Sequence, residues 1–473
     1  MSINRKATGC GKKFFLYNKS MNVKSLNAEE QYNKMVNTPV SKLITGLAVP
    51  TVISMLVTSV YSMADTFFVS HINTQASAAV GIVFPIMSII QACGFTLGMG
   101  GGSLVSVRLG QKRDEDAYKI ASTAFFTAIG IGALITLFGN LFSNQFLSLV
   151  GASEAVLPYA KDYARYIFWG APIMCASFVL NNVLRSEGKA FFSMIALASG
   201  GLLNIALDPL FIYGLGMGIS GAAVATLISQ VWGFVGLLSW YLRGKSVCKL
   251  SLKYYSFTFK VLGKTVWTGI PSLARQGLAS VATILLNTAA GAYGDEAVAA
   301  VSIVGKILWF LGSIMVGLGQ GFTPVSGYNY GAKRNDRVKK AYFFTVISGT
   351  VILGLLSTII FIFANQLMRG FINDDEAVRI GVDTLRWQVA FVALHPITIG
   401  SNMLMQSTRK IRVATFLSMT RQGVYFIPAI LILPRLLGLT GVEISQAVAD
   451  ICSAITAIPF VIALFKKMDE SQN

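Results

Sequence analysis

Two aspartates lie in apolar stretches of this chain where a charge is unfavourable. Asp65 lies in the segment 61–66, and Asp208 lies in the segment 204–209. An ionisable side chain in the middle of a bilayer costs on the order of 3 kcal/mol even on insertion scales, so each one needs a partner or a function. Either aspartate alone could be a structural, hydrogen-bonded acid. The two together favour a site that takes up positive charge.

Further oxygen ligands accompany these carboxylates. Asn204 and Asp208 are four residues apart and therefore share one helix face. Pro209 has no N–H, which frees the backbone carbonyl four residues before it. Thr226 lies in the next apolar stretch, with Ala222 one turn earlier on the same face. Such hard oxygen ligands suit a proton or Na⁺ rather than a soft transition metal. The sequence predicts a cation-coupling site, H⁺ or Na⁺, at Asp65, Asn204, Asp208, Thr226 and Ala222, the first four holding the ion if it is Na⁺.

The elements that must position these residues occur twice. An offset of 221 residues places Pro271 on Pro50, and it places Gly319 and Gly321 on Gly98 and Gly100. Two facing copies of one membrane unit are the usual plan of a secondary transporter, with the site between them. Proline removes a backbone donor and clashes with the preceding turn, so we expect Pro50 and Pro271 to be hinges. The glycines favour close packing or sliding of helices.

The second copy carries different chemistry. Leu286 and Ala429 stand where Asp65 and Asp208 would repeat, so the ion site is expected in the first copy alone. The second copy instead has deep cations and one deep acid, namely Arg275, Lys306, Arg421 and Asp450. Because a lone buried charge is unfavourable, we expect Lys306 and Asp450 to form a structural ion pair. Alternatively, Lys306 or Arg275 lines a cavity and selects substrates.

Composition sets the fold class. The 473 residues are 54% hydrophobic and only 13% charged, which excludes a soluble domain of this size. The apolar stretches are long enough to span a bilayer as helices, and period-two alternation is absent. We expect an all-α integral membrane protein of twelve spanning helices in two pseudo-symmetric six-helix lobes. The expected units are a basic tail at 1–38, an N-lobe at 39–242, a linker at 243–261, a C-lobe at 262–466 and a tail at 467–473.

The net charge of +18 follows topology rather than nucleic-acid binding. Most Lys and Arg residues lie in the tails and in every second loop, whereas the opposite loops carry only Lys161, Arg369, Arg379 and Arg435. This positive-inside pattern predicts that both termini are cytoplasmic. The five cysteines and the isolated His71 and His395 have no spacing typical of a metal site, a disulfide framework or a membrane enzyme. We expect no enzymatic activity and no cofactor besides the coupling ion.

The chain resembles the multidrug and toxic compound extrusion (MATE) family over roughly residues 40–466, and within it the bacterial MepA-type multidrug exporters. The matching stretches are Pro50 and segments 65–69, 108–110, 184–189, 204–214 and 221–226. The resemblance implies two six-helix lobes around a V-shaped cavity. It also implies that Asp65, Asn204, Asp208 and Thr226 form the cation site of the first lobe. The branch that uses acids in the seventh and tenth spans differs, because the seventh span expected here, roughly 262–289, has no acid, and Asp383 lies only at the edge of the tenth, roughly 380–405.

The resemblance implies a multidrug efflux antiporter, a monomer in the bacterial cell membrane that exports drugs and organic cations in exchange for H⁺ or Na⁺. The alternatives are a flippase for a lipid-linked precursor and an exporter of one specific metabolite. A flippase needs a strongly cationic central cavity. The alternatives are therefore separated by whether Arg275, Lys306 and Arg421 face that cavity or pair away from it.

Overall fold

The computed structural model describes residues 28–256, 258–372 and 374–470, and this part of the chain is helical without a β-strand. A helix at 28–37 precedes the first long helix. The first half contains α2 (Val40–Ser70), α3 (Thr74–Gly110), α4 (Asp114–Leu141), α5 (Ser143–Leu149), α6 (Leu157–Ser186), α7 (Ala190–Pro209), the π-helix η1 (Leu210–Gly214) and α8 (Gly218–Leu242). The second half contains η2 (Leu252–Tyr254), α9 (Phe259–Gly291), α10 (Asp295–Gly331), α11 (Asn335–Ile362), α12 (Ala364–Arg369), α13 (Asp375–Val392), α14 (His395–Ser407), α15 (Ile411–Met419), the π-helix η3 (Thr420–Tyr425), α16 (Phe426–Leu437) and α17 (Leu439–Glu470).

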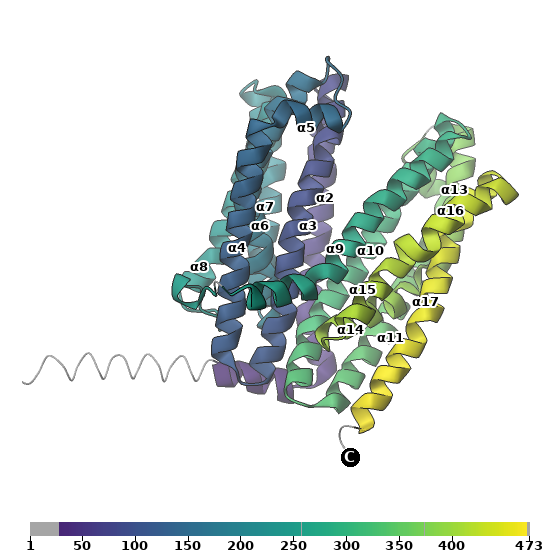
Figure 1. Cartoon of the computed structure of the whole chain (residues 1–473). Coiled ribbons are helices and arrows are strands. Elements are labelled where there is room, and N and C mark those ends of the chain that lie inside the picture. Colours follow the sequence, from purple (N-terminus) through teal and green to yellow (C-terminus); the bar gives the residue numbers. More distant parts are fainter. Residues whose placement is uncertain (1–27, 257, 373, 471–473) are drawn as a thin grey trace, which may run out of the picture.

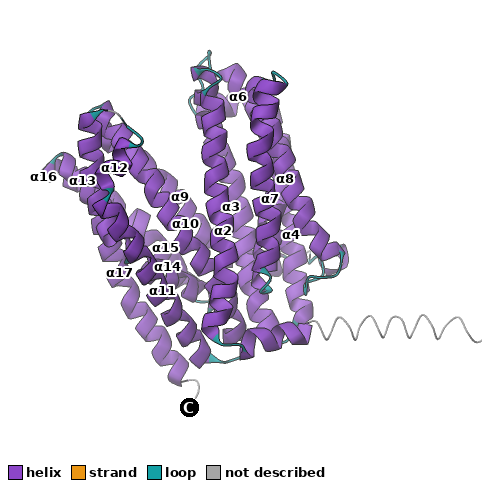
Figure 2. Ribbon diagram, turned by 180° about the vertical axis from the view of Figure 1, so that it is seen from behind, coloured by secondary structure: helices purple, strands orange, loops and turns teal. Residues whose placement is uncertain are grey.

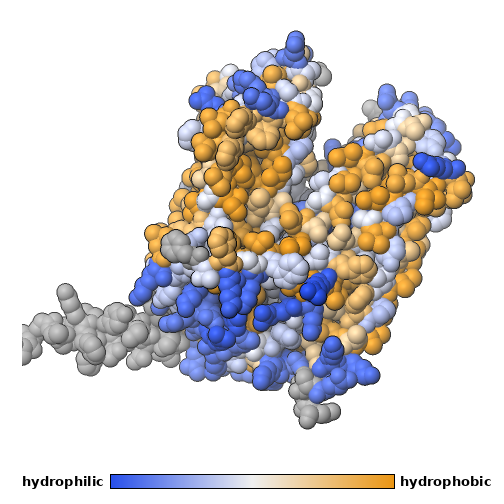
Figure 3. Space-filling model, in the orientation of Figure 1, coloured by the Kyte–Doolittle hydropathy of each residue, from blue (hydrophilic) through white to orange (hydrophobic). Residues whose placement is uncertain are grey.

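The helices form two bundles that meet at one end and diverge at the other. Helices α2 to α8 make one arm and α9 to α17 the other (Figure 1), and the view from behind shows the same division (Figure 2). The space-filling view shows an open cleft between the arms. Hydrophilic residues gather at the end where the arms meet, and an apolar belt covers their upper parts (Figure 3). We call the joined end the basic end and the other the open end.

Ten helices in the described residues are long and apolar enough to cross a membrane, against twelve expected spans. The other two expected spans are present as helices with more polar character. Helix α9 is 33 residues long but carries Lys260, Lys264 and Arg275. The tenth span is split between α13 and α14, because Pro396 lies in the first turn of α14 and cannot continue the helix before it.

Glycines close the basic end by letting helices of opposite arms touch. A Cβ on Gly100 of α3 would lie 2.1 Å from the carbonyl oxygen of Thr265 in α9, and one on Gly269 would lie 2.0 Å from the carbonyl oxygen of Thr96. The repeated glycines do the same, since a Cβ on Gly321 of α10 would lie 2.6 Å from backbone atoms of Ala48 in α2. Only glycine permits such approaches. The matched pair Gly100 and Gly321 thus forms contacts between the arms, whereas Gly98 and Gly319 pack against helices of their own arm.

The segment expected as a polar tail contains the helix at 28–37, which contacts both arms. The amide of Gln31 donates to the carbonyl of Glu187 at the end of α6 (2.7 Å). The amide of Asn329 in α10 donates to the carbonyl of Met35 (3.2 Å), whose side chain is buried. Residues 1–27, which hold most of the expected tail and Met21 as an alternative start, lie outside the described residues. The helix thus bridges the two arms at the basic end.

Candidate cation-coupling site

The expected cation ligands come from α2, α7 and α8, which pack together in the N-lobe. Asn204 and Asp208 lie one turn apart on α7 and are buried, at 2% and 0% exposure. The Asn204 amide donates to Oδ1 of Asp208 (3.1 Å), as the i, i+4 spacing permits. Asp65 is half-buried on α2 and acts electrostatically on Asp208. The fold therefore brings both carboxylates and the amide to one place.

Three oxygens of this cluster are buried without a hydrogen-bond partner. They are Oδ1 of Asp65, Oδ1 of Asn204 and Oδ2 of Asp208. A buried polar atom left without a partner carries a desolvation penalty of about 1–3 kcal/mol, more for a charged group. A proton shared by the carboxylates, or a Na⁺ ion held by these oxygens, would remove that penalty. The donor set fits either ion, since all three unpartnered atoms are hard oxygens.

Thr226 and Ala222 occupy the α8 side of the cluster. Both are buried, at 6% and 0% exposure. The Thr226 side chain lies close enough to the hydroxyl of Tyr163 of α6 to interact with it. Ala222 has no side-chain ligand and lies one turn before Thr226, where its small side chain leaves room for close packing.

Two tyrosines and one glutamine join the cluster without having been expected from the sequence. Tyr163, at 1% exposure, interacts electrostatically with Asp65 and Asp208. Tyr61 lies one turn before Asp65, interacts electrostatically with it, and lies near Gln230 of α8. The spacing of four residues between Tyr61 and Asp65 is a sequence signal that could have identified Tyr61. Nothing in the sequence marks Tyr163, because it comes from α6.

The backbone is irregular directly after Asp208 and Pro209. The chain passes into the π-helix η1, where the N–H of Leu215 donates to the carbonyl of Leu210 (2.9 Å). The hydroxyl of Tyr213 in this π-helix donates to the carbonyl of Phe68 in α2 (2.7 Å). Single π-turns are frequent at functional sites. This one joins the helix of Asp208 to the helix of Asp65.

The prediction of an ion pair between Lys306 and Asp450 is wrong. Asp450 of α17 accepts from Nε of Arg421 (2.6 Å) in η3, and its other oxygen lies 2.9 Å from Nε2 of His395. Gln446 also donates to Asp450 (3.0 Å). The expectation failed because α17 packs against α13, α14 and α16. Asp450 therefore finds its cation on the neighbouring span.

Lys306 instead faces the cleft. Along α10, Gly321 and Gly317 pack against Ala48 and Val52 of α2, and Ser313 lies within hydrogen-bond distance of Ser59 (3.4 Å). These residues recur every four positions, so they mark the α10 face toward the N-lobe. Lys306 lies two turns beyond Ser313 toward the open end, on the same face, and its side chain is exposed.

Arg275 lies where the arms join. Its guanidinium is 3.8 Å from the sulfur of Met99 in α3, and the hydroxyl of neighbouring Ser272 is 3.2 Å from the same sulfur. Arg275 is half-buried. Of the three cations that were to separate an exporter from a flippase, Arg421 pairs inside the C-lobe, whereas Arg275 and Lys306 lie between the lobes.

The model of the MatE family matches the chain over residues 50–210 and again over residues 271–431. The chain belongs to the MatE family. The two matches are offset by 221 residues (271 − 50 and 431 − 210), the same offset as the predicted repeat. The expected class, an all-helical membrane protein of two six-helix lobes, is thus confirmed for this MatE protein, and it is a transporter rather than an enzyme.

Similar proteins cover nearly the whole chain. The multidrug export protein MepA of Staphylococcus haemolyticus is 26% identical to this MatE protein over 441 residues, 93% of this chain and 97% of the relative. A solved structure described as the outward-facing conformation of a multidrug resistance MATE family transporter has a TM-score of 0.88 and 27% identity, covering 92% and 98% of the two chains. A MOP superfamily transporter from Pyrococcus furiosus, described as having a binding pocket of reverse polarity, has a TM-score of 0.87 and 27% identity over the same shares.

Proposed function

We propose that this protein exports drugs and organic cations across a bacterial cell membrane in exchange for H⁺ or Na⁺, by alternating access between its lobes. The observation that carries the proposal is the set of buried, unpartnered oxygens of Asp65, Asn204 and Asp208 in the N-lobe. A coupling ion is the group that would complete this set. The similarity to MepA supports the class of substrate.

Helix α2 is the element that would couple the ion to the cleft. Asp65 lies near its open end, and Pro50, Ala48 and Val52 lie near its basic end against α10. Pro50 and Asp65 are fifteen residues apart, about 22 Å along a helix. A change in charge at Asp65 therefore acts on the same rigid element that forms the junction between the lobes. Pro271 occupies the matching position on α9.

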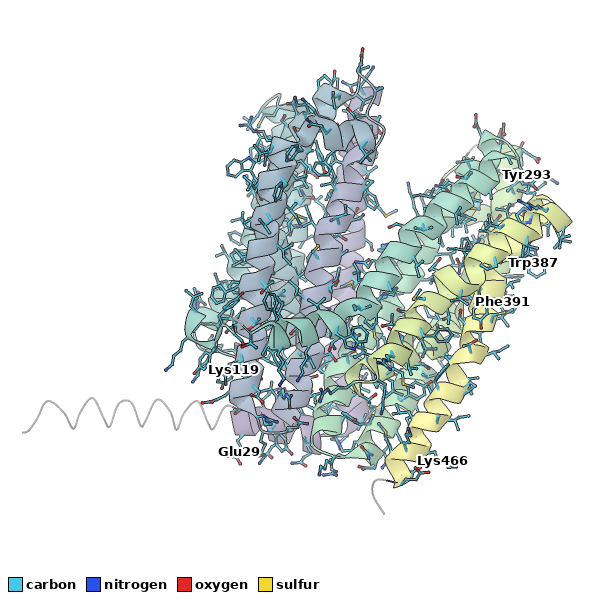
Figure 4. All side chains as sticks on the ribbon, viewed as in Figure 1. Glu29, Lys119, Tyr293, Trp387, Phe391 and Lys466 are labelled. Carbon is cyan, nitrogen blue, oxygen red and sulfur yellow. The ribbon has the colours of Figure 1, made fainter. Side chains whose placement is uncertain are left out.

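The orientation follows from the charge pattern. The basic end holds the helix at 28–37 and the last described turn of α17, near Lys466 (Figure 4). We place this end, and with it both termini, in the cytoplasm. The cleft then opens to the outside, as in the outward-facing relative. We propose that the protein works as a monomer, since the cleft and the cation site are both built from one chain.

A second candidate rests on Arg275 and Lys306. Both lie between the lobes, where they would attract an anionic amphiphile such as a lipid-linked precursor rather than an organic cation. A relative of this fold is described as having a pocket of reverse polarity and a different function. An exporter of one anionic metabolite would use the same two cations.

Transport into vesicles separates these candidates. We expect purified protein in liposomes to move a fluorescent organic cation against its gradient when a Na⁺ or a pH gradient is imposed, and not without a gradient. Imposing each gradient alone identifies the ion. If the protein moved a fluorescent anionic lipid analogue and did not move the organic cation, the exporter hypothesis would be rejected in favour of the flippase.

Replacing Pro50 with alanine should slow turnover more than it weakens substrate binding. Alanine restores the missing backbone donor and stiffens α2 between the lobe junction and Asp65. Efflux rates in vesicles and the affinity for a fluorescent substrate in detergent measure the two effects. Pro85→Ala is the control, because Pro85 lies inside neighbouring α3 at an exposed position. Equal turnover for Pro50→Ala and wild type would reduce Pro50 to a packing residue.

A further inference from the structure

We propose that two basic pockets at the lobe junction bind the headgroups of anionic phospholipids. The first pocket, of about 500 Å³, lies between the start of α2 and the start of α11. Its lining includes Ser41 of the N-lobe and the cations Arg334, Arg337 and Lys340 of the C-lobe. Basic pockets between spanning helices on the cytoplasmic side are sites where lipid phosphates bind.

The second pocket, of about 390 Å³, lies between α4, the linker and the start of α9. Its cations are Lys119 of the N-lobe, Lys253 of the linker and Lys260 of the C-lobe. All three are exposed. Figure 4 labels Lys119 in the lower part of the N-lobe, and Figure 3 shows hydrophilic residues over this region.

The two pockets are copies of each other. The offset of 221 residues places Lys340 on Lys119, and Lys260 on Pro39. Each pocket thus lies between the first helix of one lobe and the third helix of the other. Each pocket carries three cations, of which Lys340 and Lys119 occupy matched positions, although the deep charges of the lobes diverged. A topology signal requires positive charge on this side of the membrane, but it does not require matched concave sites.

The acidic residues in the linings leave each pocket with an excess of positive charge. Asp116 in the second pocket is already paired with Arg113 (2.7 Å). Asp336 in the first pocket lies 3.7 Å from Arg334, beyond hydrogen-bond distance. Arg337 is held by Asn329 (2.8 Å) and by the carbonyl of Thr38 (2.5 Å). Arg337 is therefore fixed in place, while Arg334 and Lys340 are exposed and can reach an anion.

The apolar side of the pockets favours a lipid over a free anion. Phe344 of α11 lines the first pocket, and Phe343 and Ile347 continue along the same helix toward the apolar belt with 52% and 61% exposure. Val261 lines the second pocket. A phosphate with attached acyl chains would contact the cations and this apolar surface at once. Because both lobes line each pocket, such a lipid would stabilise the arrangement in which the basic ends meet.

Short-chain phosphatidylglycerol tests this proposal. Titrated into the purified full-length protein in a nonionic detergent, it should raise the unfolding temperature, whereas short-chain phosphatidylcholine should not. Arg334→Gln with Lys340→Gln, and separately Lys119→Gln with Lys260→Gln, should each weaken the affinity of the altered pocket about thirty-fold, taking about 1 kcal/mol for each removed cation. Combining the four substitutions should remove the stabilisation, and without lipid all variants should unfold near the wild-type temperature.

Lys466→Gln with Lys467→Gln is the matched control. It removes the same charge from exposed positions at the basic end of α17, outside both pocket linings. Equal loss of lipid response in this control would show a general charge effect and overturn the proposal. So would a wild-type response in the fourfold variant, or equal stabilisation by phosphatidylcholine. The last titration uses inorganic phosphate at matched ionic strength. If phosphate raised the unfolding temperature as much as phosphatidylglycerol does, the two pockets would be sites for free anions and not for lipids.

Discussion

Replacing either Asp65 or Asp208 with asparagine should reduce ion-driven efflux to the rate of protein-free vesicles. Each substitution keeps the size of the side chain and removes the negative charge that would hold the coupling ion. Both residues lie in the cluster whose buried oxygens have no other partner. Gradient-driven efflux from proteoliposomes measures the loss, and thermal unfolding in detergent shows that the variants remain folded.

The matched control for this prediction is Asp383→Asn. Asp383 is an exposed acid of α13, outside the N-lobe cluster, and its replacement should leave efflux intact. If both Asp65→Asn and Asp208→Asn transport at the wild-type rate, the coupling ion binds elsewhere. If only one of them is inactive, a single carboxylate carries the ion.

Replacing Asp450 or Arg421 with alanine should each lower the free energy of unfolding by about 3–5 kcal/mol. Asp450 is 2% exposed and bonded to Arg421 at 2.6 Å, so removing one partner leaves the other charge buried and uncompensated. Arg421 is partly exposed (24% for its side chain), so Asp450→Ala, which leaves Arg421 without its partner, should fall at the lower end of that range. Thermal and denaturant unfolding in detergent measures both losses.

The double variant tests whether the two residues act as a pair. Asp450→Ala with Arg421→Ala should recover part of the summed loss, since contacting residues couple and distant ones add. Lys306→Ala is the control, because Lys306 is exposed on the face of α10 toward the cleft, away from Asp450. Combined with Asp450→Ala, it should be strictly additive. If the losses of Asp450→Ala and Lys306→Ala were coupled while those of Asp450→Ala and Arg421→Ala were additive, Lys306 rather than Arg421 would be the partner of Asp450.

Features that lie within one helix were predictable from the sequence. The i, i+4 spacing of Asn204 and Asp208 fixes their common face, and the structure adds the bond between them. Pro209 marks the end of regular hydrogen bonding in α7, and a π-helix follows it. The repeat gave the two-lobed plan, because the same spacing of prolines, glycines and apolar stretches builds the same bundle twice.

Features that join different helices were decided by the tertiary structure. Tyr163 reaches the cation cluster from α6, and Asp450 takes Arg421 rather than Lys306 as its partner. Gly100 of α3 and Gly321 of α10 proved to be contacts between the lobes. Helical periodicity determines which residues of one helix share a face, but not which neighbour that face meets. The neighbour depends on how all the helices pack, and that set the partners of Asp450, the surroundings of Asp65 and Asp208, and the direction of Lys306.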